Sequence, residues 1–173
     1  HNRRLRIWSA GCSSGQEAYC IAMTLKENIS NLGSWDVKIL ATDLDRNCLK
    51  KGAAGVYSSS DLEKIPEGKF ANWASKWFVP SDGGAKQAKN EIREMITFKR
   101  LNFMDSWPIT GPFDVIFCRN VFIYFDKKMQ KACLDKFAKV QAPGDQLFLG
   151  HSESVNTITE DYHLTGQTVY SRQ

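Results

Sequence analysis

Residues 5–25 constrain the fold of this chain more than any other part of its sequence. Residues 5–9 form a short, largely apolar run typical of a strand, and a loop rich in glycine and serine follows. The apolar residues between 18 and 25 then recur at i, i+3, i+4 and i+7, the spacing of one helical face. A strand that leads through a glycine-containing loop into a helix is the opening unit of an α/β domain with a mostly parallel sheet.

The next part of the chain continues this alternation and then interrupts it. The pattern predicts a second strand over residues 37–41 and a short helix that Asp45 caps and that ends near residue 54. The segment 57–96 then contains a tryptophan and phenylalanine cluster and a Ser-Asp-Gly-Gly turn at 81–84. This composition favours a small inserted subdomain, with three antiparallel strands, over another parallel unit.

The C-terminal third returns to the regular pattern. Asp126 is placed to cap a longer amphipathic helix, which Pro143 and the following glycine end. A buried strand is expected over residues 147–150. Residues 162–165 and 168–171 flank a Gly-Gln pair and predict a closing antiparallel hairpin.

Composition excludes several classes of protein. The chain has 173 residues, 42% hydrophobic and 24% charged, which is the size and balance of one globular domain. Its apolar runs, such as residues 115–118, are too short to span a bilayer, so no membrane insertion is expected. A net charge of +4 is too small to predict nucleic-acid binding. The five cysteines include no C-x-x-C pair, so we expect no metal site, only free thiols in a reducing cytoplasm.

The loop over residues 9–17 (SAGCSSGQE) is the first candidate site, because ligands of open α/β sheets bind beyond the carboxyl ends of the strands. Gly11 and Gly15 are four residues apart and lack the G-x-G-x-x-G spacing that cradles a pyrophosphate. Glu17, in the first helical turn, would repel phosphates and suits a ligand with a positive charge, such as S-adenosylmethionine (SAM). In the structural alternative, Ser14 and Glu17 form an S-x-x-E capping box.

Polar residues also follow the next two expected strands. Asp43 lies just past the second strand, where an acidic side chain can accept both hydroxyls of an adenosine ribose. Asn102 and Phe103 follow a strand that ends near residue 100, a place suited to adenine contacts. A turn or cap role is the alternative for Asp43, and Asn102 could equally be a turn residue.

A further candidate group follows the buried strand 115–118. Arg119 and Asn120 come directly after it and should line the same cleft, and Tyr124 could reach the mouth of that cleft. A surface ion pair for Arg119 and core packing for Tyr124 are the alternatives. No general base accompanies these residues. A carboxylate acceptor, with a pKa of about 4.3, is already ionised at neutral pH and needs only positioning and desolvation, so it is the favoured acceptor.

Five motifs in this order resemble those of the chemotaxis-receptor glutamate methyltransferases, the CheR family. They are IWSAGCSSGQEAY at 7–19, ATDLD at 41–45, FDVIFCRNVFIYF at 113–125, GHSE at 150–153 and GQTVY at 166–170. The third is the most specific, and together they cover nearly the whole chain.

The resemblance implies a Rossmann-like, seven-stranded sheet of the class I SAM-dependent methyltransferase type. Residues 1–173 would form the catalytic domain, with 57–96 as the inserted β-subdomain. SAM would be the methyl donor, and glutamate side chains of methyl-accepting chemotaxis receptors the acceptors, giving glutamyl methyl esters and S-adenosylhomocysteine (SAH). In some members such an insert holds the C-terminal peptide of a receptor.

The resemblance also assigns site residues. Gln16 departs from the family, many members of which have a second glutamate there. The family's N-terminal helical domain, with a linker motif that closes over the cofactor, is not among these 173 residues, so residues 1–173 alone should lack part of the site. By motif position, Tyr124 and Arg119 are expected at the transferring methyl group, and Ala10, Gly11, Glu17, Asp43, Asn102, Phe103, Arg119 and Asn120 at the cofactor.

Three other functions compete with this one. A cofactor-sensing module would bind SAM without turnover, and a methyltransferase could instead use a small-molecule or nucleic-acid acceptor. A dinucleotide oxidoreductase is disfavoured by the glycine spacing and by Glu17.

Overall fold

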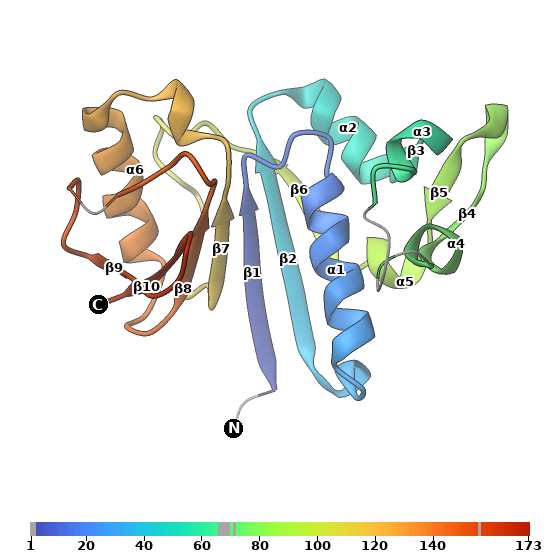
Figure 1. Ribbon diagram of the computed structural model, residues 1–173, viewed down its shortest axis with the longest axis horizontal. Coiled ribbons are helices and arrows are strands. Elements are labelled where there is room, and N and C mark those ends of the chain that lie inside the picture. The colour runs from blue at the N-terminus through green and yellow to red at the C-terminus, as the bar shows by residue number, and fades with distance from the viewer. Residues whose placement is uncertain (1–2, 66–69, 71, 156) are drawn as a thin grey trace.

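A seven-stranded sheet organises the computed structural model, which describes residues 3–65, 70, 72–155 and 157–173 (Figure 1). The strand order is β6-β2-β1-β7-β8-β10-β9. The first five strands in this order are parallel, and β10 pairs antiparallel with both β8 and β9, so the closing hairpin is confirmed. The strands are β1 (Arg4–Ala10), β2 (Asp36–Asp43), β6 (Ile96–Arg100), β7 (Val115–Cys118), β8 (Gln146–Leu149), β9 (Tyr162–Leu164) and β10 (Val169–Arg172).

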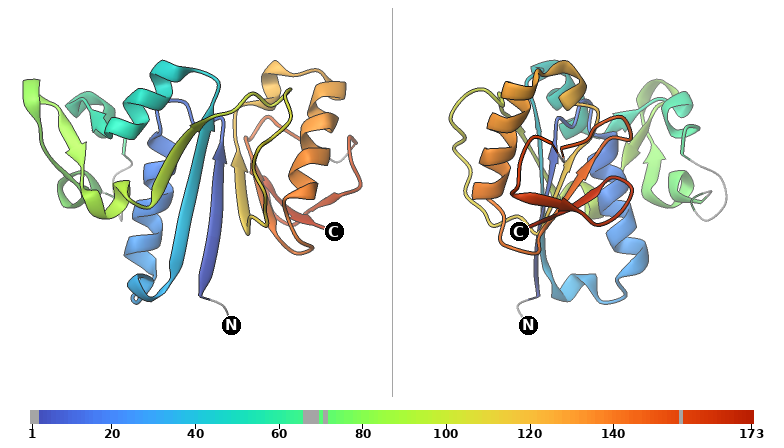
Figure 2. Two further views of the ribbon diagram at one scale, coloured as in Figure 1. Left: turned by 180° about the vertical axis from the view of Figure 1, so that it is seen from behind. Right: turned by 60° about the vertical axis from the view of Figure 1, so that its left-hand side comes forward.

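Helices cover both faces of this sheet. The helices α1 (Gln16–Asn28) and α6 (Lys127–Lys139) lie on opposite faces (Figure 2), and α2 (Arg46–Ala54) follows β2. Both predicted caps are confirmed. The Asp45 carboxylate accepts hydrogen bonds from two backbone N–H groups at the start of α2, and Asp126 accepts one from the N–H of Met129 at the start of α6.

Each face of the sheet has its own hydrophobic core, because successive side chains of a strand point to opposite faces. Ile7 of β1 belongs to the core beneath α1, whereas the neighbouring Trp8 belongs to the core beneath α6. The Trp8 ring packs edge-on against Phe137 of α6, with ring centroids 5.2 Å apart. Its buried indole N–H donates to the Thr42 hydroxyl at 2.9 Å, so the indole of β1 is also tied to β2.

The insert forms a second sheet of three antiparallel strands, in the order β3-β5-β4, as the sequence pattern predicts. Residues 66–69 and 71 of the predicted segment 57–96 lie outside the described residues, and Ile96, its last residue, already belongs to β6 of the central sheet. The elements of the insert are β3 (Val56–Tyr57), α3 (Ser59–Leu62), α4 (Trp73–Trp77), β4 (Phe78–Pro80), β5 (Lys86–Ala88) and α5 (Asn90–Arg93), with a short 3-10 helix at Asp82–Gly84. Two other short 3-10 helices, Leu32–Ser34 and Phe122–Tyr124, lie outside the insert.

The insert packs on α1 and extends the core on that face. Trp73, Trp77 and Phe78 are buried in the same hydrophobic cluster as the residues of α1. The Trp77 indole and the Lys76 ammonium both bind the carboxylate of Glu27, near the end of α1. Within the described residues, no helix is both long and apolar enough to cross a membrane.

Candidate functional site

A cavity of about 380 Å³ lies where the carboxyl ends of β1, β2, β6 and β7 meet. We call it the carboxyl-edge cavity. Six of the predicted site residues line it: Gly11, Asp43, Asn102, Phe103, Asn120 and Tyr124. The lining also includes Ser13, Leu44, Leu101, Met104, Val121 and Phe125, which the sequence analysis did not single out.

The loop after β1 forms one wall of the cavity, and its backbone is tied to β2. The N–H groups of Gly11 and Cys12 both donate to the Thr42 carbonyl oxygen, at 2.8 and 2.9 Å. Gly11 has a φ of 80°, in the left-handed region that favours glycine. A Cβ atom added to Gly11 would also clash with Cγ2 of Val121, so the loop can approach the opposite wall this closely only with glycine at this position.

Asp43, the last residue of β2, is held in place by backbone donors. Its Oδ2 accepts from the N–H of Ser13 at 2.7 Å, and its Oδ1 accepts from the N–H of Asp45 at 3.0 Å. An ionised carboxylate has about four acceptor positions, so both oxygens can accept further hydrogen bonds from a ligand. The Asp43 carbonyl oxygen accepts from the N–H of Leu101 at 3.0 Å and so joins the loop after β6 to this wall.

Glu17 does not form the capping box, so the structural alternative for it is wrong. The N-cap of α1 is Gly15, in a left-handed conformation, and no side chain caps the helix. The Glu17 side chain, 25% exposed, turns instead toward β1, where its Oε1 accepts from the Ser9 hydroxyl at 2.7 Å. Burial raises the pKa of Glu17, and the Ser9 hydroxyl and the Arg119 guanidinium oppose this shift.

Arg119 forms an ion pair with Glu17, which agrees with the alternative given for Arg119 in the sequence analysis. Its Nη1 lies 3.7 Å from Oε2 of Glu17. Neither residue is among the described residues that line the carboxyl-edge cavity, and Ala10, the buried last residue of β1, is not either. Arg119 and Ala10 are nevertheless next to lining residues along the chain, because Arg119 precedes Asn120 and Ala10 precedes Gly11. The ion pair joins Glu17 to Arg119.

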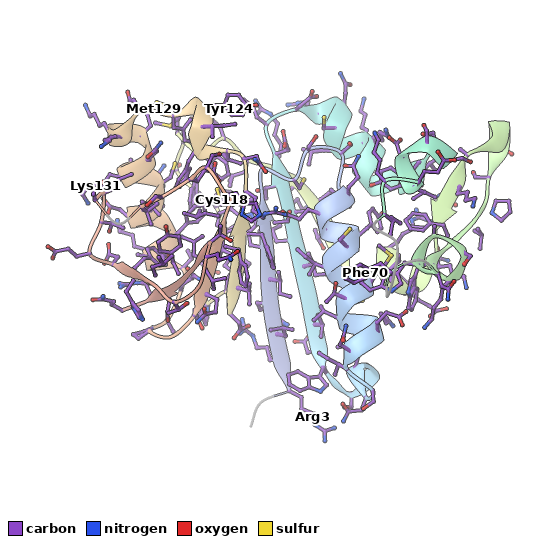
Figure 3. All side chains as sticks on the ribbon, viewed as in Figure 1. Arg3, Phe70, Cys118, Tyr124, Met129 and Lys131 are labelled. Carbon is purple, nitrogen blue, oxygen red and sulfur yellow. The ribbon has the colours of Figure 1, made fainter. Side chains whose placement is uncertain are left out.

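Tyr124 lies at the mouth of the cavity, and the core-packing alternative for it is wrong. Its side chain is 79% exposed, whereas Phe122, two residues earlier, is buried in the core. Figure 3 shows Tyr124 at the edge of the molecule, above Cys118, the last residue of β7. Leu44 and Met104, which also line the cavity, are exposed apolar side chains, so the mouth has an apolar rim.

A second cavity of about 540 Å³ lies beside α6, lined by Lys131 and residues 157–161. It is larger but lies away from the carboxyl ends of β1 and β2, and none of the predicted site residues lines it. The carboxyl-edge cavity, which six of the predicted site residues line, is therefore the candidate functional site. Elsewhere, no group of three or more His, Cys, Asp or Glu residues within the described ranges could hold a metal ion, and all five cysteines are free.

Comparison with known proteins agrees with this geometry. Residues 1–171 match the family model described as the CheR methyltransferase, SAM binding domain. A probable chemotaxis protein methyltransferase of Rhizobium etli is 44% identical over 154 residues, which cover 88% of this chain and 57% of that protein. Chemotaxis protein methyltransferase 2 of Pseudomonas aeruginosa is 40% identical over 98% of this chain and 60% of its own length. The chain thus spans about three fifths of the length of these relatives.

Solved structures support the fold. The CMeT domain of the citrinin polyketide synthase superposes with a TM-score of 0.51 at 14% identity, over 84% of this chain and 28% of that chain. The [4+2]-cyclase SpnF gives the same score and identity, over 84% of this chain and 38% of its own. Identities this low show the fold alone, an α/β domain with a mostly parallel central sheet. The family match and the identities to curated relatives show more: this chain belongs to the CheR methyltransferase family and is its SAM-binding domain.

Proposed function

We propose that this domain binds SAM in the carboxyl-edge cavity and helps transfer its methyl group to glutamate side chains of methyl-accepting chemotaxis receptors. The products would be glutamyl methyl esters and SAH. One observation carries the proposal: Asp43, Asn102, Asn120 and Tyr124, from the ends of three different strands, line one cavity in a chain of the CheR family. The relatives named chemotaxis protein methyltransferases support receptors as the acceptors.

The residues of the cavity fit an adenosine. Asp43 has a fixed carboxylate with open acceptor positions, which suits the two hydroxyls of a ribose. The Asn102 Oδ1 accepts from the N–H of Met104 at 3.1 Å, and its amide nitrogen makes no hydrogen bond to any described residue, so it can donate to a base. The Phe103 ring adds an apolar wall. These three residues would hold the nucleoside.

The charges beside the cavity fit the methionine part of SAM. Burial disfavours the charged form of Glu17, and a ligand ammonium would supply part of the stabilisation that burial removes. Arg119 would bind an anionic group of the ligand or remain paired with Glu17. Glycine at position 11 lets the loop pass close to Val121 on the opposite wall, because a Cβ there would clash with the Val121 side chain.

The chemistry requires positioning rather than proton transfer. When bound, SAM supplies a methyl group on a sulfonium; the acceptor oxygen forms the new bond while the sulfur takes the electron pair of the broken one. An ionised glutamate needs no base. The hydroxyl of Tyr124, exposed at the cavity mouth, would donate a hydrogen bond to the acceptor carboxylate and orient it. The apolar rim would exclude water around the reacting carboxylate.

The receptor would contact the domain at two places. Its cytoplasmic helical region would present the glutamate to the cavity mouth, which places the reaction in the cytoplasm. Its C-terminal peptide would extend the small sheet of the 57–96 insert, in which β4 has an edge that pairs with no strand of the described residues.

The test uses the full-length protein that carries this domain. The protein is incubated with methyl-labelled SAM and receptor-containing membranes, and the volatile methanol released by mild base is counted. We expect base-labile label on the receptor and its loss in Asp43→Ala. The matched control is Asp135→Ala, which removes an exposed carboxylate on α6 outside the cavity and should retain full transfer. An absence of label despite calorimetric binding of SAH would contradict the proposal, and base-stable label on RNA would indicate another acceptor.

A further inference from the structure

A carboxylate outside the cavity holds the turn that forms one of its walls. Glu153 lies in the segment after β8 and is only 8% exposed. The strands β7 and β8 pair in parallel, so the segments that leave their carboxyl ends lie side by side. The Glu153 side chain crosses from one segment to the other, to the turn after β7 that contains Asn120.

The Glu153 carboxylate accepts hydrogen bonds from three backbone N–H groups. Its Oε2 accepts from Gly150 at 2.6 Å and from Asn120 at 3.0 Å, and its Oε1 accepts from Phe122 at 2.7 Å. A buried backbone N–H needs a partner, and outside a helix or a strand ladder that partner must come from elsewhere. Glu153 provides it for two residues of the turn at once.

This turn has an unusual backbone and depends on close packing around the carboxylate. Asn120 has a φ of 58°, a left-handed conformation that is uncommon for a residue other than glycine. A Cβ added to Gly150 would lie 2.7 Å from Oε2 of Glu153 and 3.1 Å from the Asn120 nitrogen, so glycine is needed for the carboxylate to approach. From the other side, Nε2 of Gln130 donates to the carbonyl oxygens of Phe122 and Phe125, both at 2.9 Å.

The turn carries the side chains on which the transfer depends. Asn120, Val121, Tyr124 and Phe125 all line the carboxyl-edge cavity, whereas Glu153 does not. We infer that Glu153 is a positioning residue: through the N–H groups of Asn120 and Phe122 it sets the turn that presents Asn120 and Tyr124 to cofactor and acceptor. The inference rests on the proposed function, since it assigns this turn a role in the same reaction.

The test is Glu153→Gln in the full-length protein. A glutamine has one acceptor oxygen in place of two, and its amide N–H groups would face the backbone N–H groups that the second carboxylate oxygen now accepts from. Two donors repel, so the turn that contains Asn120 must move. We expect kcat for methyl transfer to fall about 100-fold, the loss that a misplacement of roughly 1 Å can cause. The dissociation constant of SAH should rise about tenfold, the lower end of the loss in metal affinity when a residue that orients a metal ligand is replaced.

Gln141→Leu is the matched control. Gln141 is 7% exposed and also makes three hydrogen bonds, donating to the carbonyl oxygens of Phe113 and Gln146 and accepting from the Tyr162 hydroxyl. It lies at the opposite, amino-terminal ends of β7 and β8. Its loss should lower stability but leave kcat and SAH affinity per folded molecule unchanged, which separates positioning from a general loss of structure.

Two further measurements keep the inference testable. If Glu153→Gln does not fold, Gly150→Ala displaces the same carboxylate while keeping every polar group, and it should weaken SAH binding in the same direction. If the wild-type protein methylates no receptor, the proposed function fails, but the SAH dissociation constants of Glu153→Gln and Gln141→Leu still decide the role of Glu153. Wild-type kcat and SAH affinity in folded Glu153→Gln would overturn the inference.

Discussion

Replacement of Gly11 by alanine should cost far more stability than an ordinary glycine substitution, for two separable reasons. The φ of Gly11 is 80°, a conformation in which the Cβ of an L-residue is unfavourable by about 1–2 kcal/mol. The added Cβ would also clash with Cγ2 of Val121 on the opposite wall. Forcing an extra carbon into a packed contact costs about 1–3 kcal/mol. We therefore expect Gly11→Ala to lower the free energy of unfolding by about 2–5 kcal/mol.

The control for Gly11→Ala is Gly144→Ala. Gly144 has a φ of 93°, but a Cβ there would have nothing within 4 Å, so only the conformational cost of about 1–2 kcal/mol remains. Urea unfolding of the two variants measures the difference, which is the cost of the contact with Val121. In a double-mutant cycle, Val121→Ala should relieve that cost and give a coupling of about 1–3 kcal/mol. Equal losses in Gly11→Ala and Gly144→Ala, without coupling to Val121, would refute this reasoning.

Three further predictions concern other parts of the site and the fold. Because burial raises the pKa of Glu17, protonation of this group should compete with a cationic ligand, so SAH affinity should fall as the pH is lowered from neutral through that pKa. Calorimetry over the same pH series should show no such dependence in Glu17→Gln. Asp126→Ala removes the cap that accepts from Met129 and should cost about 1 kcal/mol in urea unfolding, with unchanged SAH affinity. Tyr124→Phe should change stability by less than about 0.5 kcal/mol, because the side chain is exposed. It should nevertheless lower kcat for methyl transfer about 10- to 100-fold, the value of one hydrogen bond to a charged group; wild-type turnover would remove Tyr124 from the transfer site.

Much of the fold follows from local sequence signals. Asp45 and Asp126 cap their helices because an N-cap depends only on the next two or three residues, and those are visible in the sequence. The antiparallel hairpin of β9 and β10 follows in the same way from alternating residues around a glycine-containing turn. The seven-stranded arrangement is different, because strand order is a long-range property. It could be expected only from the resemblance to a family.

Residues that reach the cavity because they follow the end of a strand could be predicted from the sequence. Side chains whose orientation depends on a partner far along the chain could not. Asp43 ends a strand at the carboxyl edge, and the same rule placed Asn120. Ser14 and Glu17 have the spacing of a capping box, but the N-cap of α1 is Gly15, one residue after Ser14. The Glu17 side chain turns instead to Ser9 and Arg119. These partners are 8 and 102 residues away along the chain, so spacing alone could not identify them.

Glu153 shows the same limit. The GHSE motif at 150–153 is visible in the sequence, but its glutamate binds backbone N–H groups about 30 residues earlier. No side-chain pattern identifies a backbone donor as the partner. Only the parallel pairing of β7 with β8 brings Glu153 to the turn at Asn120.

The most direct test of the account is a crystal structure of the full-length protein with SAH bound. SAH should lie in the carboxyl-edge cavity, with its ribose on Asp43, its adenine beside Asn102 and Phe103, and its ammonium near Glu17. SAH in the larger cavity beside Lys131, or at the carboxyl edge but without contact to Asp43, would contradict the assignment of the site.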